Sequence, residues 1–252
     1  MVARAIIMSP NDNEFLGYAF FIFSFTTEHY KGIAKELFEL DIIKNVIQCL
    51  DIDVLNIQLS CLRIIGNIAS GNANQTQLLI DLNVLDYLKK TILNKTKTIR
   101  KETAWIISNI AAGTQKQIET LIKENFLPIL DQLIENDDYE IRRECIWGVC
   151  NFTSVENPEY MKKILEQNIL KIIHDCLKSE SAKYLAVSLE ALGNLLAFGK
   201  QISKNGINPI MIEAEKIGFC DILENLQFHP VEVVYEKTLK LLETYFETEL
   251  LE

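Results

Sequence analysis

Two tryptophans in this sequence stand in nearly identical surroundings. Trp105 and Trp147 are 42 residues apart, and each has a glutamate three positions before it and an asparagine four positions after it. At 3.6 residues per turn these three side chains share one face of a helix. Indole faces, a carboxylate and a primary amide can hold a cation and hydrogen-bond a peptide backbone. The repeated stretch therefore predicts binding chemistry rather than catalysis.

The tryptophans should point away from the core. The apolar stripe of the first stretch passes through Ile99, Thr103 and Ile107, and Trp105 lies about 200° around the helix from Thr103 at roughly 100° per residue. A lone tryptophan on a helix is more often a core residue. Two in register, each off the core face and each joined to glutamate and asparagine, favour a binding role.

The spacing of the tryptophans predicts a slot for a long basic side chain. Neighbouring helices pack about 8–10 Å apart, and van der Waals contacts lie at roughly 3.5–4.0 Å, so the gap between stacked indoles admits one methylene chain. A lysine or arginine stem fits there, and its charge gains about 0.5–2 kcal/mol from the ring faces. Glu102 and Glu144, one turn before the rings, would supply the counter-charge.

Asparagines recur at the same phase and form what we call the asparagine ladder. Asn67, Asn109, Asn151 and Asn194 are separated by 42, 42 and 43 residues. Each amide offers a donor and an acceptor, so the ladder would grip the N–H and C=O groups of an extended peptide. Buried asparagines can also tie neighbouring repeats together, and both roles can coexist.

Other residues fill the tryptophan position in the outer repeats. Arg63 occupies it in the preceding repeat and Glu190 in the following one. The arginine would make one end of the groove electropositive, which disfavours a lysine there. The preference for basic residues should therefore be centred on the two tryptophans.

The elements that position these residues repeat with the same period. A second marker recurs at intervals of 42, 42 and 43 residues, at Asp41, Asn83, Asn125 and Asn168. These residue types, with Gly218 in the same place of a later unit, suit a break where one residue adopts the left-handed conformation. A period near 42 with a short, a medium and a long helix is typical of armadillo repeats. The predicted fold is all-α, a right-handed α-solenoid of about four to five such repeats.

We expect residues 27–252 to form this array, with residues 1–26 as an atypical N-terminal segment, either a partial edge repeat or a non-native start. The run 15–25 is apolar and aromatic, but acidic rather than cationic residues precede it, and it is too short to span a bilayer. A buried helix at the edge of the array is the expected structure. In the last unit we expect a long loop over 199–209 and a capping helix over 231–249.

Composition disfavours several classes of function. Asp and Glu total 35 against 25 Lys and Arg, a formal net charge of −10, which argues against nucleic acid and for a basic partner. The six cysteines form no C-x-x-C pair and are expected to be reduced core residues. His29, His174 and His229 lack metal-ligand spacing, and no phosphate-binding or nucleophile motif occurs. We predict no catalytic residue, metal or cofactor, and neither nucleic acid nor membrane as a partner.

Several motifs resemble those of one family. They are Gly66-Asn67-Ile68-Ala69-Ser70-Gly71, Gln75-Thr76-Gln77, Lys101-Glu102-Thr103-Ala104-Trp105, Ser108-Asn109-Ile110-Ala111-Ala112-Gly113 and Arg143-Glu144-Cys145-Ile146-Trp147. From about Thr27 to Phe246 the chain resembles the C-terminal half of importin-α, the armadillo adaptor that carries nuclear localisation signals. The resemblance implies a concave minor signal-binding site at Glu102, Trp105, Ser108, Asn109, Glu144, Trp147 and Asn151, with Arg63 and Asn67 at its edge and Asn194 and Glu190 continuing the groove.

The resemblance also implies partners and a location. It predicts a nuclear import adaptor of the cytoplasm and nucleus that binds Lys/Arg-rich segments of cargo, and C-terminal units that meet a recycling exportin and nucleoporins. The family's basic importin-β-binding segment and major site are not visible, so importin-β is not among the expected partners. The alternative is an interaction scaffold of the catenin type, whose usually basic groove fits the net charge less well. A hidden hydrolase or transferase is more distant, and a deep pocket with convergent titratable groups would revive it.

Overall fold

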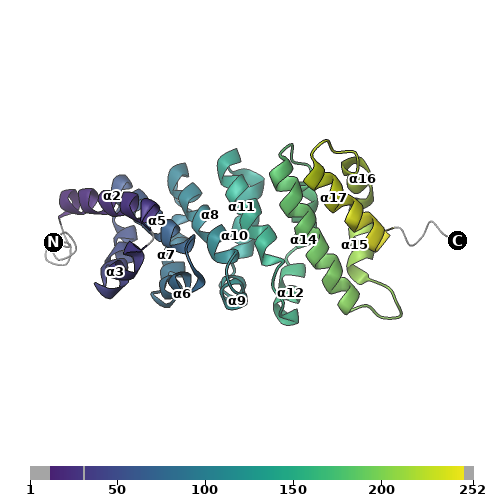
Figure 1. Cartoon of the computed structure of the whole chain (residues 1–252), viewed down its shortest axis with the longest axis horizontal. Helices are drawn as coiled ribbons and strands as arrows, with labels where there is room; N and C mark the ends of the chain where they lie inside the picture. The colour runs from purple at the N-terminus through teal and green to yellow at the C-terminus, as the bar shows by residue number, and fades with distance from the viewer. Residues whose placement is uncertain (1–11, 31, 247–252) are drawn as a thin grey trace.

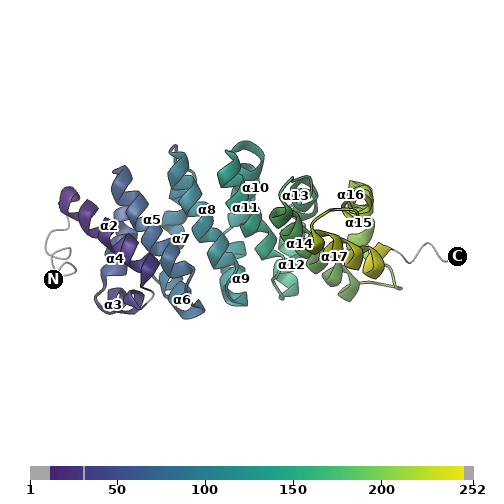
Figure 2. The same ribbon diagram turned by 45° about the horizontal axis from the view of Figure 1, so that its top comes forward.

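The protein is a stack of helices in one repeated order. This computed structural model describes residues 12–30 and 32–246. Within these residues the regular elements are helices, apart from one isolated bridge between Lys204 and Ile207. The helices are stacked one after another along the long axis of the molecule, from the N-terminus to the C-terminus (Figure 1). The turned view shows the same order (Figure 2). The all-α solenoid predicted from the repeat is confirmed.

Five units of three helices make up the described array. The bounds are α3 Ile33–Glu39, α4 Ile42–Gln48 and α5 Leu55–Ala69; α6 Ala73–Asp81, α7 Val84–Thr91 and α8 Lys97–Ala111; α9 Gln115–Lys123, α10 Phe126–Asn136 and α11 Tyr139–Phe152; α12 Pro158–Leu165, α13 Ile169–Cys176 and α14 Ala182–Gln201; α15 Pro209–Ile217, α16 Phe219–Leu226 and α17 Glu232–Leu241. A 3-10 turn, Cys49–Asp51, follows α4, and a π-helical turn, Leu242–Phe246, follows α17. The third helices of successive units pack side by side.

Helix α2, Asn13–His29, forms the N-terminal edge of this layer. It packs against α5 much as α5 packs against α8, and it buries Leu16, Phe20 and Phe23. The expected boundary between residues 26 and 27 falls inside this helix, while residues 1–11 lie outside the described part. Helix α2 thus takes the place of the third helix of an edge unit. Across 12–30 and 32–246, none of the helices combines the length and apolarity needed to cross a bilayer.

A left-handed residue joins the first helix of each unit to the second. The φ angle is 56° at Asp41, 60° at Asn83, 57° at Asn125 and 58° at Asn168, and it is 98° at Gly218. Asparagine and aspartate visit this region more readily than other residues with a Cβ, and glycine does so freely. The left-handed break predicted from the recurring marker is confirmed in all five units.

The end of α14, in the fourth unit, differs from expectation. A loop was predicted from Gly199, but α14 continues to Gln201. A Cβ on Gly199 would lie 2.0 Å from Asn208 Oδ1, and Asn208 Nδ2 donates to the Leu196 carbonyl at 3.0 Å. Glycine is therefore required for close packing between α14 and the start of α15, and it does not break the helix.

Four of the six cysteines are core residues, as expected, whereas Cys49 and Cys220 are only partly buried. All six are free thiols, and Cys61, Cys145, Cys150 and Cys176 are buried. Burial raises the pKa of Cys150 to about 12, which keeps its thiol protonated at neutral pH. The thiolate is the reactive form, so this cysteine contributes packing rather than nucleophilic chemistry.

Candidate functional site

Trp105 and Trp147 project from α8 and α11, which pack side by side. Both indoles are half-buried against the core. Trp105 lies across Gly66 of α5, where a Cβ would stand 2.1 Å from its Cζ3. Trp147 meets Tyr184 of α14 edge to face, with ring centroids 6.3 Å apart. Neighbouring repeats therefore hold both rings, and part of each ring remains open to solvent.

Three of the four asparagines of the ladder donate hydrogen bonds to the preceding repeat. The Nδ2 groups donate as follows: Asn67 to the Ser24 carbonyl at 3.0 Å and the Thr27 hydroxyl at 3.0 Å, Asn151 to the Ser108 carbonyl at 3.1 Å, and Asn194 to the Thr153 hydroxyl at 3.2 Å. The Oδ1 atoms of these three accept no hydrogen bond from the described chain. The sequence left two roles open, and the structure shows the one that ties repeats together.

Asn109 differs from the rest of the ladder. Its Nδ2 is buried and has no hydrogen-bond partner among residues 12–30 and 32–246. An unsatisfied buried donor costs about 1–3 kcal/mol. Asn109 lies one turn after Trp105 on α8, so the uncommitted donor belongs to the same helix face as the first indole.

The carboxylates beside the indoles are not equally available. Arg63 Nε lies 3.5 Å from Glu102 Oε1, and Lys237 Nζ lies 2.9 Å from Glu190 Oε2. Glu144 forms no ion pair with any described residue, and burial raises the pKa of its carboxyl although nearby cations oppose the shift. Arg63 was expected to make one end electropositive, yet Glu102 offsets part of its charge. Glu144 is thus the carboxylate near the indoles with no cationic partner of its own.

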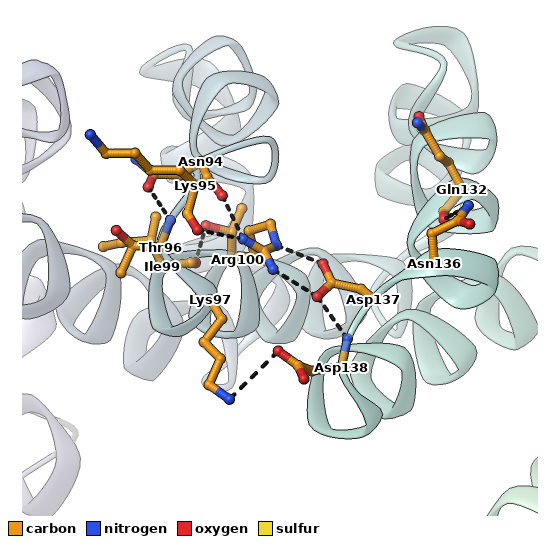
Figure 3. A network of polar contacts seen from close by, with 11 residues as sticks. Asn94, Lys95, Thr96, Lys97, Ile99, Arg100, Gln132, Asn136, Asp137 and Asp138 are labelled. Carbon is orange, nitrogen blue, oxygen red and sulfur yellow. Dashed lines mark hydrogen bonds and ion pairs between the residues drawn. The ribbon is translucent and has the colours of Figure 1, made fainter.

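An ion pair fixes the seam between the two tryptophan repeats. Arg100 of α8 holds Asp137, just before α11, through Nε to Oδ2 at 2.6 Å and Nη2 to Oδ1 at 2.7 Å (Figure 3). Its Nη1 donates to the carbonyls of Asn94 and Lys95 at 2.8 and 3.0 Å. The side chains of Arg100 and Asp137 are only 17% and 7% exposed. Hydrogen bonding from Arg100 holds the pKa of the Asp137 carboxyl below its usual range. This bidentate pair links α8 to the start of α11.

The next seam lacks this clamp. Arg142 and Glu180 occupy the positions of Arg100 and Asp137 one repeat later, yet no ion pair joins them within the described chain. A cavity of about 780 Å³ opens there, between α10 and α11 on one side and α13 and α14 on the other. Its lining carries both signs of charge, from Asp131, Glu135, Arg143, Lys171 and Asp175 among others, so it does not define one class of ligand.

The fold and the ladder define an armadillo-repeat protein. A family model described as Armadillo/beta-catenin-like repeat matches residues 114–154, which hold α9, α10 and α11. A designed armadillo repeat protein solved in complex with the peptide (KR)4 is 26% identical, with a TM-score of 0.84 over 97% of this chain and 98% of that chain. Computationally designed armadillo repeat proteins for modular peptide recognition share the fold, with a TM-score of 0.86 at 24% identity over 96% of this chain and 99% of that chain.

Within this class the chain is homologous to the C-terminal half of importin subunit alpha. It is 36% identical to importin subunit alpha-3 of Arabidopsis thaliana over 245 residues, which is 95% of this chain and 46% of that protein. It is 40% identical to importin subunit alpha-7 of the same plant over 256 residues, 97% of this chain and 48% of that protein. The chain spans about half the length of these curated relatives. The resemblance stated from the motifs is confirmed.

Proposed function

We propose that the chain is a nuclear import adaptor that binds extended Lys/Arg-rich segments of cargo through its layer of third helices. The observation that carries this proposal is the register of Trp105 and Trp147, which project from adjacent helices at one phase of the repeat and are partly exposed. A basic stem between the two rings gains about 0.5–2 kcal/mol from cation–π attraction. Glu144, which has no ion pair of its own in the described chain, would face the incoming charge.

The ladder would hold the backbone of such a peptide. The Oδ1 atoms of Asn67, Asn151 and Asn194 accept no hydrogen bond within residues 12–30 and 32–246, and they would accept its N–H groups. The Nδ2 of Asn109 is buried, so it would donate to a peptide carbonyl only after its side chain rotates. Ser108 would act indirectly, because its carbonyl accepts the Asn151 amide and so sets the orientation of that side chain. Contacts of this kind are indifferent to peptide side chains, and sequence preference would come from the indoles.

Charge and relatives support a basic ligand. The net charge of −10 attracts cationic segments, and a designed armadillo repeat protein of the same fold was solved with the peptide (KR)4. The relatives named importin subunit alpha support residence in both cytoplasm and nucleus. A recycling exportin and nucleoporins would meet the C-terminal units. A scaffold of the catenin type is the alternative, and its usually basic groove suits this acidic chain less well.

The test is a titration of a labelled lysine-rich peptide against the chain and against the double variant Trp105→Ala/Trp147→Ala. Loss of two cation–π contacts should weaken binding about ten-fold or more. Phe228→Ala removes an aromatic side chain that is 81% exposed and serves as the control. Rising salt should also weaken binding to the unaltered chain. Equal affinities for wild type and double variant would sink the proposal.

A further inference from the structure

An apolar pocket adjoins Trp147 on its C-terminal side, toward α14 and α17. A pocket of about 480 Å³ opens over α14, between α11 and the start of α17. Its apolar walls are Trp147, Ala182, Ala186, Val187, Val231 and Val233. The indole of Trp147, which would bound the proposed tryptophan slot, therefore also forms a wall of this pocket.

Small and exposed apolar residues create the pocket. Ala182 and Ala186 lie one turn apart on α14, where their methyl groups leave room above the helix. Val231 and Val233, at the start of α17, are 41% and 43% exposed. Apolar surface in a concave site gains free energy when an apolar group displaces its water.

The charges around the pocket disfavour another basic residue. Glu190 stands at the tryptophan phase of its repeat, but Lys237 lies 2.9 Å from it and offsets its charge. The remaining charged residue of the lining is Lys183, which is exposed and makes no ion pair with the described chain. The lining thus carries more positive than negative charge, in contrast to the surroundings of Glu144.

We propose that this pocket binds one large apolar side chain of the same peptide that places a lysine between Trp105 and Trp147. The inference rests on the proposed function and names its ligand class, a basic segment with an apolar residue on one flank. An extended peptide advances about 3.3 Å per residue, and neighbouring helices lie about 8–10 Å apart. The pocket lies between one and two helices beyond the slot, so about three to five residues separate the apolar residue from the lysine.

The test uses a set of short lysine-rich peptides. Each peptide carries one leucine, placed two to six residues from the lysine on one side or the other. Each is compared with the same peptide that has serine at that position. Fluorescence anisotropy gives the dissociation constants. Leucine at about three to five positions on one side should tighten binding about ten-fold. The other placements should give no gain.

Two variants localise the gain. Val231 and Val54 are the N-cap residues of α17 and α5, and aspartate is a favoured N-cap, so Val231→Asp and Val54→Asp should both fold. Val231→Asp should abolish the leucine gain, whereas Val54→Asp, far from the pocket, should keep it. Ala186→Leu, which fills the pocket, should also abolish the gain.

The outcomes separate the two proposals. If the serine peptides bind and leucine adds nothing at any position, the pocket proposal is wrong and peptide binding stands. A gain that survives both Val231→Asp and Ala186→Leu also overturns the pocket. If neither leucine nor serine peptides bind the unaltered chain, both proposals fail.

Discussion

The indole of Trp105 rests directly on the backbone of Gly66. A Cβ at Gly66 would lie 2.1 Å from Cζ3 and 2.6 Å from Cε3 of the ring, which is closer than such atoms approach in proteins. Any other residue at this position must therefore displace the indole. The position of the Trp105 indole thus depends on a glycine of the preceding repeat.

Gly66→Ala should destabilise the chain and weaken peptide binding. Glycine to alanine inside a helix normally stabilises it by about 1 kcal/mol, but overpacking here should lower the free energy of unfolding by about 1–3 kcal/mol. Urea denaturation measures the change. Gly193→Ala in α14 is the matched control, because the nearest atom to its Cβ would be Leu241 Cδ2 at 3.4 Å. The two variants should shift stability in opposite directions, and a shared gain would contradict the contact.

Asp137→Asn should weaken the seam between the two tryptophan repeats. The change removes the charge that faces Arg100 while the guanidinium stays mostly buried, so we expect a loss of about 1–3 kcal/mol in the free energy of unfolding at pH 7. Asp138→Asn is the control, because this exposed carboxylate lies 3.5 Å from Lys97 and such surface pairs contribute about 0–1 kcal/mol. Equal losses from the two variants would argue against a special role for Arg100.

The same pair predicts a direction for the pH dependence of stability. Hydrogen bonding from Arg100 lowers the pKa of Asp137 in the folded chain. Its stabilisation is fully present above the unfolded pKa, about 3.9, and is lost as the pH falls through the lower folded value. The difference in unfolding free energy between wild type and Asp137→Asn should therefore shrink below about pH 4. A difference that stays constant down to pH 2 contradicts this assignment.

Glu144→Gln should weaken binding of a lysine-rich peptide and raise the stability of the fold. Burial raises the pKa of Glu144, so its contribution to stability is present below the unfolded pKa, about 4.3, and is lost as the pH rises through the folded value. Removing the charge should raise the free energy of unfolding at pH 7 by about 0.5 kcal/mol. It should also weaken a lysine-rich peptide about three- to ten-fold. Glu140→Gln, at an exposed carboxylate 2.9 Å from Lys101, should do neither; unchanged affinity in Glu144→Gln would exclude this counter-charge.

Asn125→Ala should cost about 1 kcal/mol, because alanine must then adopt a φ near 57° between α9 and α10. Asn125→Gly should be nearly neutral, since glycine adopts positive φ freely and Gly218 already does so in the fifth unit at 98°. Chemical denaturation of both variants gives the comparison. Asn136→Ala, at a right-handed position of α10, is the control for loss of an amide. Similar costs for Asn125→Ala and Asn125→Gly would rule out backbone strain as the cause.

The fold could be predicted because its signals are local and repeated. The left-handed positions at Asn83 and Asn125 follow from the conformational preference of single residues. The long third helix from Lys97 follows from the period of its apolar residues. Each unit contacts mainly its neighbours, so the order of units along the chain already gives their order in space.

The state of the site could not be predicted, because it depends on contacts between units. The repeat predicts which helix face carries Glu102 and Asn67. It does not predict that Arg63 forms an ion pair with Glu102, or that the Ser24 carbonyl accepts a hydrogen bond from Asn67. The position of Gly66 inside an apolar helical pattern was the one available signal of close packing by Trp105. Gly199 shows the same limit, because the sequence does not distinguish a glycine needed for close packing from a glycine that ends a helix.

The two seams on either side of α11 are built differently, and the array should therefore be less stiff at one than at the other. Arg100 and Asp137 lock the seam toward α8, whereas a cavity of about 780 Å³ separates α11 from the unit that follows. Helix α11 contacts α14 less extensively than it contacts α8. The solenoid should therefore bend more easily at the second seam. The spacing of α8 and α11 should then vary less than the distance from Trp147 to α17. Peptide contacts that span only α8 and α11 should therefore be less sensitive to bending of the array than contacts that also reach α17.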